Sequence, residues 1–504
     1  MKRLVLLDPQ DSVAVALDGL EPGDRGALLG AGCGQAPAAR EAVAPGHKLA
    51  LADLAAGSAV LKYGMPIGRA TRDIPAGAWV HSHNLASALG EDPDYRPAPP
   101  YRWPGREAAL ETLARSGLPD HFLGYRRAGG AVGIRNEVWV LPTVGCVNRS
   151  AEQVAELGRR EFGLDAFAFG HPYGCSQLGG DLDATRAILA GLAAHPNAAG
   201  VVVVSLGCEN NTLAGFQAAL GDQDPDRVQF LPLQQVQDEE GETRRILAQL
   251  ARRCADQARV RLPLAELVVG LKCGGSDGLS GITANPLVGR VCELLVAAGG
   301  SALLTEVPEM FGAETGLMAR ACDAQVFQEQ VRMVNGFKAY FRAHGQEVYE
   351  NPSPGNRDGG ITTLEEKSLG CIRKAGLVPV MDVIGYGRRR RGRGLTLISG
   401  PGNDLVSATA LTAAGAQLIL FTTGRGTPFG APAPTLKIAS NTDLATRKPR
   451  WIDFDAGRVL AGASFDQLAV ELFREVIAVA GGTPAKAELG GYREIAIFKD
   501  GVTL

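Results

Sequence analysis

The chain has 504 residues, of which 45% are hydrophobic and 21% are charged, and its formal net charge is −3. This length exceeds what one hydrophobic core usually serves, so we expect two or three domains. A nucleic-acid-binding protein normally has a strongly basic face, which this balance of charges does not indicate. No apolar run approaches the roughly 20 residues that span a bilayer. We therefore expect neither nucleic acid nor a membrane as a partner.

The N-terminal residues and the cysteines indicate where the protein works. Met1-Lys2-Arg3 is followed by an apolar stretch that reaches Asp8 too soon for a secretory signal. The nine cysteines are scattered along the chain without disulfide-like spacings. Thiols in this pattern are typical of a reducing compartment, so we expect a cytoplasmic protein.

Residues 1–88 are predicted to form a small all-β domain. Short apolar runs at 13–17, 46–51, 59–64 and 74–81 alternate with Gly and Pro turn signals. Residues 89–125 are rich in Pro and Asp and are predicted to be a linker with one short helix at about 106–115.

From residue 126 the pattern is α/β. Strand-like runs at 137–144, 165–169, 201–206, 267–271, 302–304, 377–384 and 417–422 alternate with helical segments such as 150–162 and 183–193. Strands alternating with long helices predict parallel sheets with crossover helices. We expect two catalytic subdomains, 126–260 and 261–504, so the fold class is a multidomain chain with an all-β domain followed by an α/β region.

Four cysteine-bearing clusters follow predicted strands, at 143–148, 171–177, 206–211 and 271–277. Ligands gather at the carboxyl ends of strands in open parallel sheets, because the loops converge there. Each cysteine also lies near glycine, an amide or a carboxylate. A single buried thiol would mean little, but four such clusters predict a shared functional site.

Two histidines lie at the end of the last strand-like run of the β domain. His81 and His83 lie on the same side of an extended segment, because side chains alternate with period two. Such a pair suits a divalent metal. The alternative is an exposed strand end without a ligand.

Loops rich in Gly, Pro and Asn punctuate the C-terminal half and suit a hydroxyl-rich substrate. Within them, Arg425 or Lys437 could hold a substrate carboxylate. A glycine-rich dinucleotide fingerprint after a strand is not present in the sequence, so nucleotide binding is not favoured.

These segments resemble the altronate/galactarate dehydratase family over nearly the whole chain. The similarity is densest in KYGMPIG at 62–68, PTVGCVN at 142–148, YGCSQLG at 173–179, GCENN at 207–211, CGGSDGLSG at 273–281, TEVPE at 305–309 and TTGRGTP at 422–428. The 92–121 segment is poorly matched. The resemblance implies that the β domain is of the SAF (β-clip) type and that His81 and His83 belong to its closing motif.

The resemblance also implies the reaction: loss of water from a sugar acid, with D-altronate giving 2-dehydro-3-deoxy-D-gluconate in hexuronate breakdown. Family members depend on a divalent metal, so Fe²⁺ or Mn²⁺ is the expected cofactor. An iron–sulfur cluster is the main rival, since three separated Gly-Cys sites would suit one. The sequence has no close Cys-x-x-Cys pair that would support a cluster, so we favour a mononuclear ion. A homodimer is a further expectation from the family.

The predicted site has three parts. The expected metal ligands are His81 and His83, completed by one or more of Cys146, Cys175, Cys208 and Glu209. The acid–base candidates, which the sequence does not rank, are His171, Lys272, Asp277, Glu306 and Glu309. The substrate-binding candidates are Asn148, Asn210, Ser276, Arg425 and Lys437.

Three alternatives stay open at this point. The chain could act on galactarate or another sugar acid, or it could eliminate a different group, such as sulfite, from a 2-hydroxy acid. Outside the enzymes, it could be a catalytically inactive sugar-acid-binding protein. The metal-ligating residue types argue against that last alternative, because a simple binding protein needs no metal.

Overall fold

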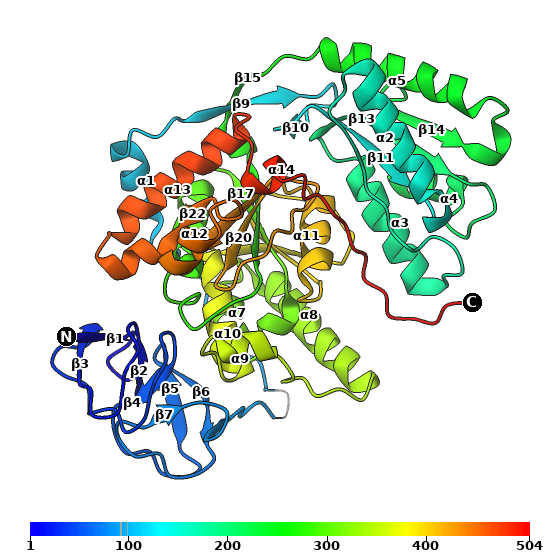
Figure 1. Ribbon diagram of the computed structural model, residues 1–504. Coiled ribbons are helices and arrows are strands. Elements are labelled where there is room, and N and C mark those ends of the chain that lie inside the picture. Colours follow the sequence, from blue (N-terminus) through cyan, green and yellow to red (C-terminus); the bar gives the residue numbers. More distant parts are fainter. Residues whose placement is uncertain (91–92, 98) are drawn as a thin grey trace.

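The structure is a computed structural model that describes residues 1–90, 93–97 and 99–504. Residues 91, 92 and 98 of the predicted linker lie outside the described residues. Figure 1 shows a small β unit at one end of the molecule, a large α/β unit in the centre and a second α/β unit at the other end. These are called the N-terminal β unit (residues 1–88), the C-terminal unit (residues 264–504) and the middle unit (residues 137–255).

The N-terminal β unit has two small sheets. The first, in the order β3-β1-β2-β4-β7, and the second, β5-β6-β8, enclose short apolar runs such as Val13–Ala16. The tight turn at Gly77 (φ 83°) accommodates only glycine, because a Cβ there would lie 2.1 Å from the Ala38 carbonyl oxygen. The strands are β1 (Lys2–Leu6), β2 (Val13–Ala16), β3 (Gly26–Gly30), β4 (Lys48–Ala50), β5 (Ala59–Lys62), β6 (Met65–Ala70), β7 (Trp79–Val80) and β8 (Leu85–Ala86).

A helix and an antiparallel sheet join this unit to the rest. Helix α1 (Arg106–Arg115) has the bounds that the sequence predicts. Strand β9 (His121–Arg126) pairs with both β10 (Val132–Gly133) and β15 (Val260–Pro263). The chain therefore enters and leaves the middle unit through adjacent strands.

The middle unit is a four-stranded parallel sheet in the order β12-β11-β13-β14. Along β11, Val138 and Val140 face one hydrophobic core while Trp139 and Leu141 face the other, so helices cover both faces of the sheet. The elements are β11 (Glu137–Pro142), α2 (Asn148–Phe162), β12 (Ala166–Ala168), α3 (Gly179–Ala193), β13 (Ala198–Ser205), α4 (Leu213–Leu220), β14 (Val228–Pro232) and α5 (Glu239–Ala255), with 3₁₀ turns η1 (Gly145–Val147) and η2 (Leu233–Gln235).

The C-terminal unit is a seven-stranded parallel sheet in the order β18-β19-β17-β16-β20-β21-β22, with helices on both faces. Its strands are β16 (Val268–Cys273), β17 (Ser301–Leu304), β18 (Val380–Ile384), β19 (Gly394–Ile398), β20 (Leu418–Thr423), β21 (Thr435–Ala439) and β22 (Phe454–Asp455). Its helices are α6 (Ala284–Ala297), α7 (Glu314–Met318), α8 (Ala324–Ala343), α9 (Pro354–Asp358), α10 (Leu364–Cys371), α11 (Asp404–Ala413), α12 (Thr442–Arg447), α13 (Phe465–Ala480) and α14 (Lys486–Leu489), with 3₁₀ turns η3 (Leu264–Glu266), η4 (Val307–Glu309), η5 (Ile372–Ala375) and η6 (Ala456–Ala461).

The predicted fold class, an all-β domain followed by an α/β region with parallel sheets, is confirmed. Within the described part of the chain, every helix is too short or too polar to cross a bilayer. The central strand β16 is buried along its whole length, so the residues at its carboxyl end are held at the centre of the largest sheet.

Candidate active site

Oppositely charged side chains meet at the carboxyl edge of the seven-stranded sheet. We call Lys272, Cys273, Glu306, Glu309, Lys367, Cys371 and Lys374 the charged cluster. Lys272 and Cys273 end the central strand β16, and Glu306 follows β17. The Glu306 carboxylate accepts a hydrogen bond from Lys272 and another, 2.7 Å long, from Lys374. All three of these side chains are about 1% exposed or less.

The ion pairs determine which of these groups are charged. Burial alone would lower the pKa of the Lys272 ammonium, but Glu306 and Asp404 outweigh it and hold that pKa well above its usual range. Burial alone would raise the pKa of the Glu309 carboxyl, but Lys367, 3.0 Å away, and then Lys272 and Lys374 lower it. Lys272 and Glu309 are therefore both ionised at neutral pH.

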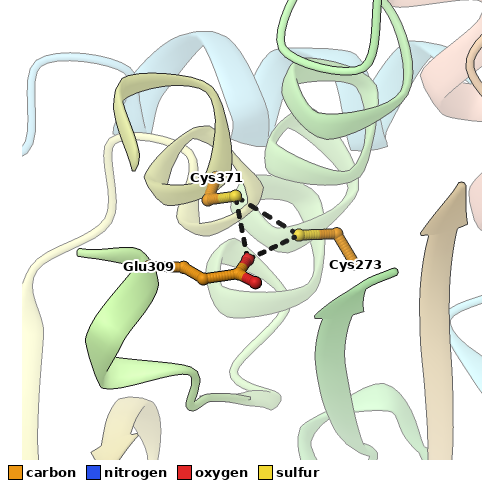
Figure 2. Close-up of side chains that lie close together, drawn as sticks. All are labelled: Cys273, Glu309 and Cys371. Atoms are coloured by element: carbon orange, nitrogen blue, oxygen red, sulfur yellow. Dashed lines mark hydrogen bonds between the residues drawn. The ribbon is translucent and has the colours of Figure 1, made fainter. Parts of the chain in front are cut away.

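Two thiols complete the charged cluster (Figure 2). The Cys273 and Cys371 sulfurs are 3.4 Å apart, and Glu309 Oε2 lies 3.5 Å from the first and 3.2 Å from the second. Lys374 Nζ donates to the Cys273 sulfur over 2.8 Å. Among the described residues, Cys273, Glu309 and Cys371 are the one group of three or more His, Cys, Asp or Glu side chains whose donor atoms all lie within 4.8 Å of one another.

The N-terminal β unit borders the cluster. Lys48 and Lys62 both lie 2.8 Å from the Glu366 carboxylate of α10, and all three side chains are buried. Burial lowers the pKa of Lys48 to about 8 despite Glu366. Burial would raise the pKa of Glu366, but the two lysines lower it to about 2. The two units are thus joined by a buried ionic contact beside the charged cluster.

One side of the cluster reaches solvent. Lys272 Nζ lies 2.9 Å from Asp404, whose side chain is 35% exposed. Arg425 is exposed, and its backbone N–H donates to the Gly275 carbonyl over 2.9 Å. Lys437 is buried near this rim with its ammonium over the Phe421 ring, and burial lowers its pKa to about 8. Asp404 therefore connects the buried Lys272 ammonium to the surface on this side of the cluster.

Asp277 and Ser276 lie in the loop after β16 and already have partners. The Asp277 carboxylate accepts hydrogen bonds from Ser280 (2.8 Å), Ser440 (2.8 and 2.9 Å) and Asn441 (3.0 Å). The Ser276 carbonyl accepts from Asn356 over 2.8 Å. Asp277 therefore holds its loop against the segment that follows β21, which is a positioning role.

The other predicted cysteines lie together in the middle unit. Cys146, Cys175 and Cys208 are exposed, on three loops that follow the adjacent strands β11, β12 and β13. Hydrogen bonds join these loops, with Asn210 accepting from the Ser176 N–H (2.8 Å). His171, Asn148 and Glu209 lie in the same loops and bond mainly to their backbone: His171 Nε2 to the Pro142 carbonyl, Asn148 to the His171 carbonyl and Glu209 to the Gly207 N–H. Burial also lowers the pKa of His171.

The histidine pair lies elsewhere. His81 is buried against α9, with its Nε2 2.9 Å from the Arg357 carbonyl and its Nδ1 3.0 Å from the Ser82 hydroxyl. Burial lowers the pKa of His81 to about 4, so the ring is neutral at pH 7. His83 is exposed and packs beside Trp79.

The structure thus distributes the predicted site residues over three places. Lys272, Glu306 and Glu309 meet in the charged cluster, with Ser276, Asp277, Arg425 and Lys437 around it; the three cysteines with Asn148, His171, Glu209 and Asn210 lie in the middle unit; His81 and His83 lie in the N-terminal β unit. No three of the six predicted metal ligands have donor atoms that all lie within 4.8 Å of one another in this chain. Their metal binding stays a prediction.

Sequence reasoning missed three members of the charged cluster, Lys367, Cys371 and Lys374, and the neighbouring Glu366. Lys367, Cys371 and Lys374 follow one another at helical spacings of four and three, which places them on one face of α10 and η5. That spacing was visible in the sequence. Lysines on a helix are usually solvated, however, so the pattern did not indicate a buried face.

Three family models match the chain and together cover nearly all of it. The altronate/galactarate dehydratase SAF domain matches residues 2–88. The second domain of D-galactarate dehydratase/altronate hydrolase matches residues 124–258, and the C-terminal domain of D-galactarate/altronate dehydratase matches residues 264–503. The charged cluster lies within the match to the C-terminal domain.

Full-length relatives agree with this assignment. The chain is 49% identical to the altronate dehydratase of Escherichia coli (strain K12), over 98% of each chain, and 46% identical to that of Bacillus subtilis (strain 168), over the whole of both. It is 31% identical to the galactarate dehydratase (L-threo-forming) of Escherichia coli (strain K12), over 91% of this chain and 90% of that one. The chain belongs to the altronate/galactarate dehydratase family.

Proposed function

We propose that this protein is a hydro-lyase that removes water from D-altronate to give 2-dehydro-3-deoxy-D-gluconate, a step of hexuronate breakdown. The observation that carries the proposal is the identity of 46–49% to two altronate dehydratases over 98–100% of the chain. The identity to the galactarate enzyme is lower, at 31%. Altronate is therefore the first substrate to test.

The charged cluster has the groups that this chemistry needs. Dehydration of a 2,3-dihydroxy acid removes the weakly acidic proton at C2 and expels hydroxide, a poor leaving group, from C3. Lys272 can exchange the partly exposed Asp404 for the substrate carboxylate. Glu306 is an acceptor for the C2 proton, and a lysine ammonium can protonate the departing hydroxyl.

A divalent metal, Fe²⁺ or Mn²⁺, is part of the proposal. Such an ion would supply a Lewis acid for the negative charge that develops on the substrate when the C2 proton leaves. The chain's own lysines neutralise the carboxylates of the charged cluster. A cytoplasmic location is proposed with it, and the cysteines, all of them free, support this.

An anaerobic turnover assay tests the function. Protein supplied with Fe²⁺ or Mn²⁺, with and without a chelator, is incubated with D-altronate, galactarate or sulfolactate, and 2-keto-3-deoxy acid or released sulfite is measured. We expect chelator-sensitive turnover of D-altronate. Product from galactarate or sulfolactate alone would contradict the assigned substrate, and no product from any acid would contradict the enzymatic function.

A matched pair of variants locates the reaction. Lys272→Met removes the ammonium that faces both Glu306 and Asp404, so we expect turnover to fall by at least about 100-fold. Lys448→Met, which removes a lysine that packs over the Trp451 ring instead, should keep it. Full turnover in a folded Lys272→Met protein would move the active site away from the charged cluster.

A further inference from the structure

Glu309 presents one carboxylate oxygen to two thiols. Its Oε1 pairs with Lys367 at 3.0 Å, whereas Oε2 points between Cys273 and Cys371 (Figure 2). Within the described part of the chain, the hydrogen-bond partners of Oε2 are these two sulfurs, at 3.5 and 3.2 Å. A thiol is a weak donor. A buried, charged oxygen is therefore left with two weak partners, although stronger donors surround it on its other side.

The three side chains come from elements that fix their positions. Cys273 ends the central strand β16, Glu309 ends η4, and Cys371 ends α10. All three are buried, with 1%, 5% and 4% exposure. The group is thus preorganised rather than gathered on mobile loops.

We propose that Cys273, Cys371 and Glu309 Oε2 bind one divalent transition-metal ion. A four-coordinate ion with metal–sulfur bonds of about 2.3 Å and metal–oxygen bonds of about 2.1 Å places its ligands roughly 3.5–3.8 Å apart. The observed separations of 3.4, 3.5 and 3.2 Å need only a small expansion. Three protein ligands leave one position for water or substrate, as in catalytic sites.

The charges of the cluster allow a divalent ion to replace the two thiol protons. When a divalent ion binds, both thiols lose their protons to solvent, so two positive charges enter and two leave. The pairing of Lys272, Lys367 and Lys374 with Glu306 and Glu309 need not change. Lys374 already donates to the Cys273 sulfur over 2.8 Å, and such an outer contact stabilises a metal-bound thiolate.

The donor types select the metal. Two thiolates and one carboxylate favour Fe²⁺ or Zn²⁺, whereas Mn²⁺ and Mg²⁺ prefer oxygen ligands. We therefore expect Fe²⁺ to bind more tightly than Mn²⁺. The use of this ion in dehydration rests on the proposed function, but its binding does not.

Cobalt substitution tests the site without relying on turnover. Anaerobically purified, reduced, metal-free protein is titrated with Co²⁺, and thiolate-to-cobalt charge-transfer absorption in the near ultraviolet is recorded. We expect one equivalent to give the band, Cys371→Ser to weaken or remove it, and Glu309→Gln to weaken Co²⁺ binding about tenfold or more. Cys33→Ser, a matched change at an exposed thiol, should leave the titration unchanged.

Several outcomes would overturn the assignment. One is the absence of the band in the wild-type protein, for which folding of a variant is no concern. Another is a band that survives in folded Cys371→Ser but disappears in a Cys146→Ser/Cys175→Ser/Cys208→Ser variant, which would place the metal in the middle unit. A Cys273–Cys371 disulfide in protein isolated under strict reduction would equally exclude it.

Turnover of D-altronate, measured on the same samples, separates the two proposals. A cobalt band that follows Cys371 in protein that dehydrates no acid would sustain the metal site and contradict the proposed function. Turnover of D-altronate without any cobalt band would sustain the proposed function and contradict the metal site.

Discussion

Glu306 combines a buried charge with an uncommon backbone conformation. Its φ is 71°, and Tyr63 and Ser176 are the other non-glycine residues with positive φ in the described part of the chain. This region costs an ordinary residue about 1–2 kcal/mol, so surrounding contacts must impose it. Here the next N–H, that of Val307, donates to the Gly400 carbonyl over 3.0 Å. Tyr63 borders α10 and Ser176 lies beside Cys175, so these conformations occur in the charged cluster, at its contact with the N-terminal β unit and in the cysteine-bearing loops of the middle unit.

Removing the Glu306 charge should destabilise the folded protein. Glu306→Gln leaves Lys272 and Lys374 facing a neutral amide in a buried site, which should lower the free energy of unfolding by about 3–5 kcal/mol. Chemical denaturation measures this change in the free energy of unfolding. The control, Glu152→Gln, breaks an exposed pair with Arg149, so its free energy of unfolding should stay close to that of the wild type. Equal stability of the two variants would show that the Glu306 ion pairs contribute no net stability.

At the residue scale, the sequence gives part of the site. Lys272, Glu306 and Glu309 were predictable because they follow strand-like runs, where parallel sheets collect polar groups. Cys371 and Lys374 were not, because their burial depends on how α10 packs between η4 and the N-terminal β unit. Spacing along one helix carries no information about those partners.

Helix α10 presents Glu366 to one unit and Cys371 to the charged cluster of its own unit. Glu366 is the partner of both Lys48 and Lys62, so a single carboxylate fixes the N-terminal β unit against the helix that carries Cys371. A change at this contact should therefore affect both docking and the shape of the cluster.

Acid should weaken this contact. The pKa of Glu366 is lowered from 4.5 to about 2, so the folded state binds fewer protons than the unfolded state between these values. The stabilisation is complete above about pH 4.5 and is lost as the pH falls towards 2. In thermal unfolding across this range, the advantage of wild type over Glu366→Gln should shrink. Glu107→Gln, on exposed α1, should show no such trend, and a constant difference for Glu366→Gln would contradict the assignment.

At the element scale, sequence patterns located most strands. The run at 201–206 became β13 (Ala198–Ser205), and helix α1 has its predicted bounds, because β-branched runs and helix-forming stretches between turn signals depend on local chemistry. The β9–β15 pairing was not predictable. It joins residues more than a hundred positions apart, and such register is set by the packed units rather than by either strand.

The C-terminal segment ties the two α/β units together. After α14 the chain runs back to the middle unit, where Arg493 pairs with buried Glu137 at 2.8 Å. Farther on, the Asp500 and Gly501 N–H groups donate to Asp181, and the Leu504 N–H donates to the Ser176 carbonyl. The end of the chain therefore supports the loop that carries Cys175.

Removing residues 499–504 should loosen that loop. The deletion takes away the hydrogen bonds to Asp181 and Ser176, so we expect faster amide exchange at residues 174–182 with little change in β16. Hydrogen–deuterium exchange with mass spectrometry measures it. Leu504→Ala keeps the backbone N–H and should exchange like wild type. Unchanged protection in the shortened protein would show that these contacts contribute nothing to the loop.

The contact between Lys48 and Glu366 also constrains how the protein is made. The two residues are 318 positions apart in the chain. At about 5–20 residues per second, a ribosome completes Lys48 roughly 15–60 s before Glu366. During that interval Lys48 and Lys62 have only water for their charges. An N-terminal β unit that folds during this interval does so with two solvated lysines, which lose their water only when α10 packs against them.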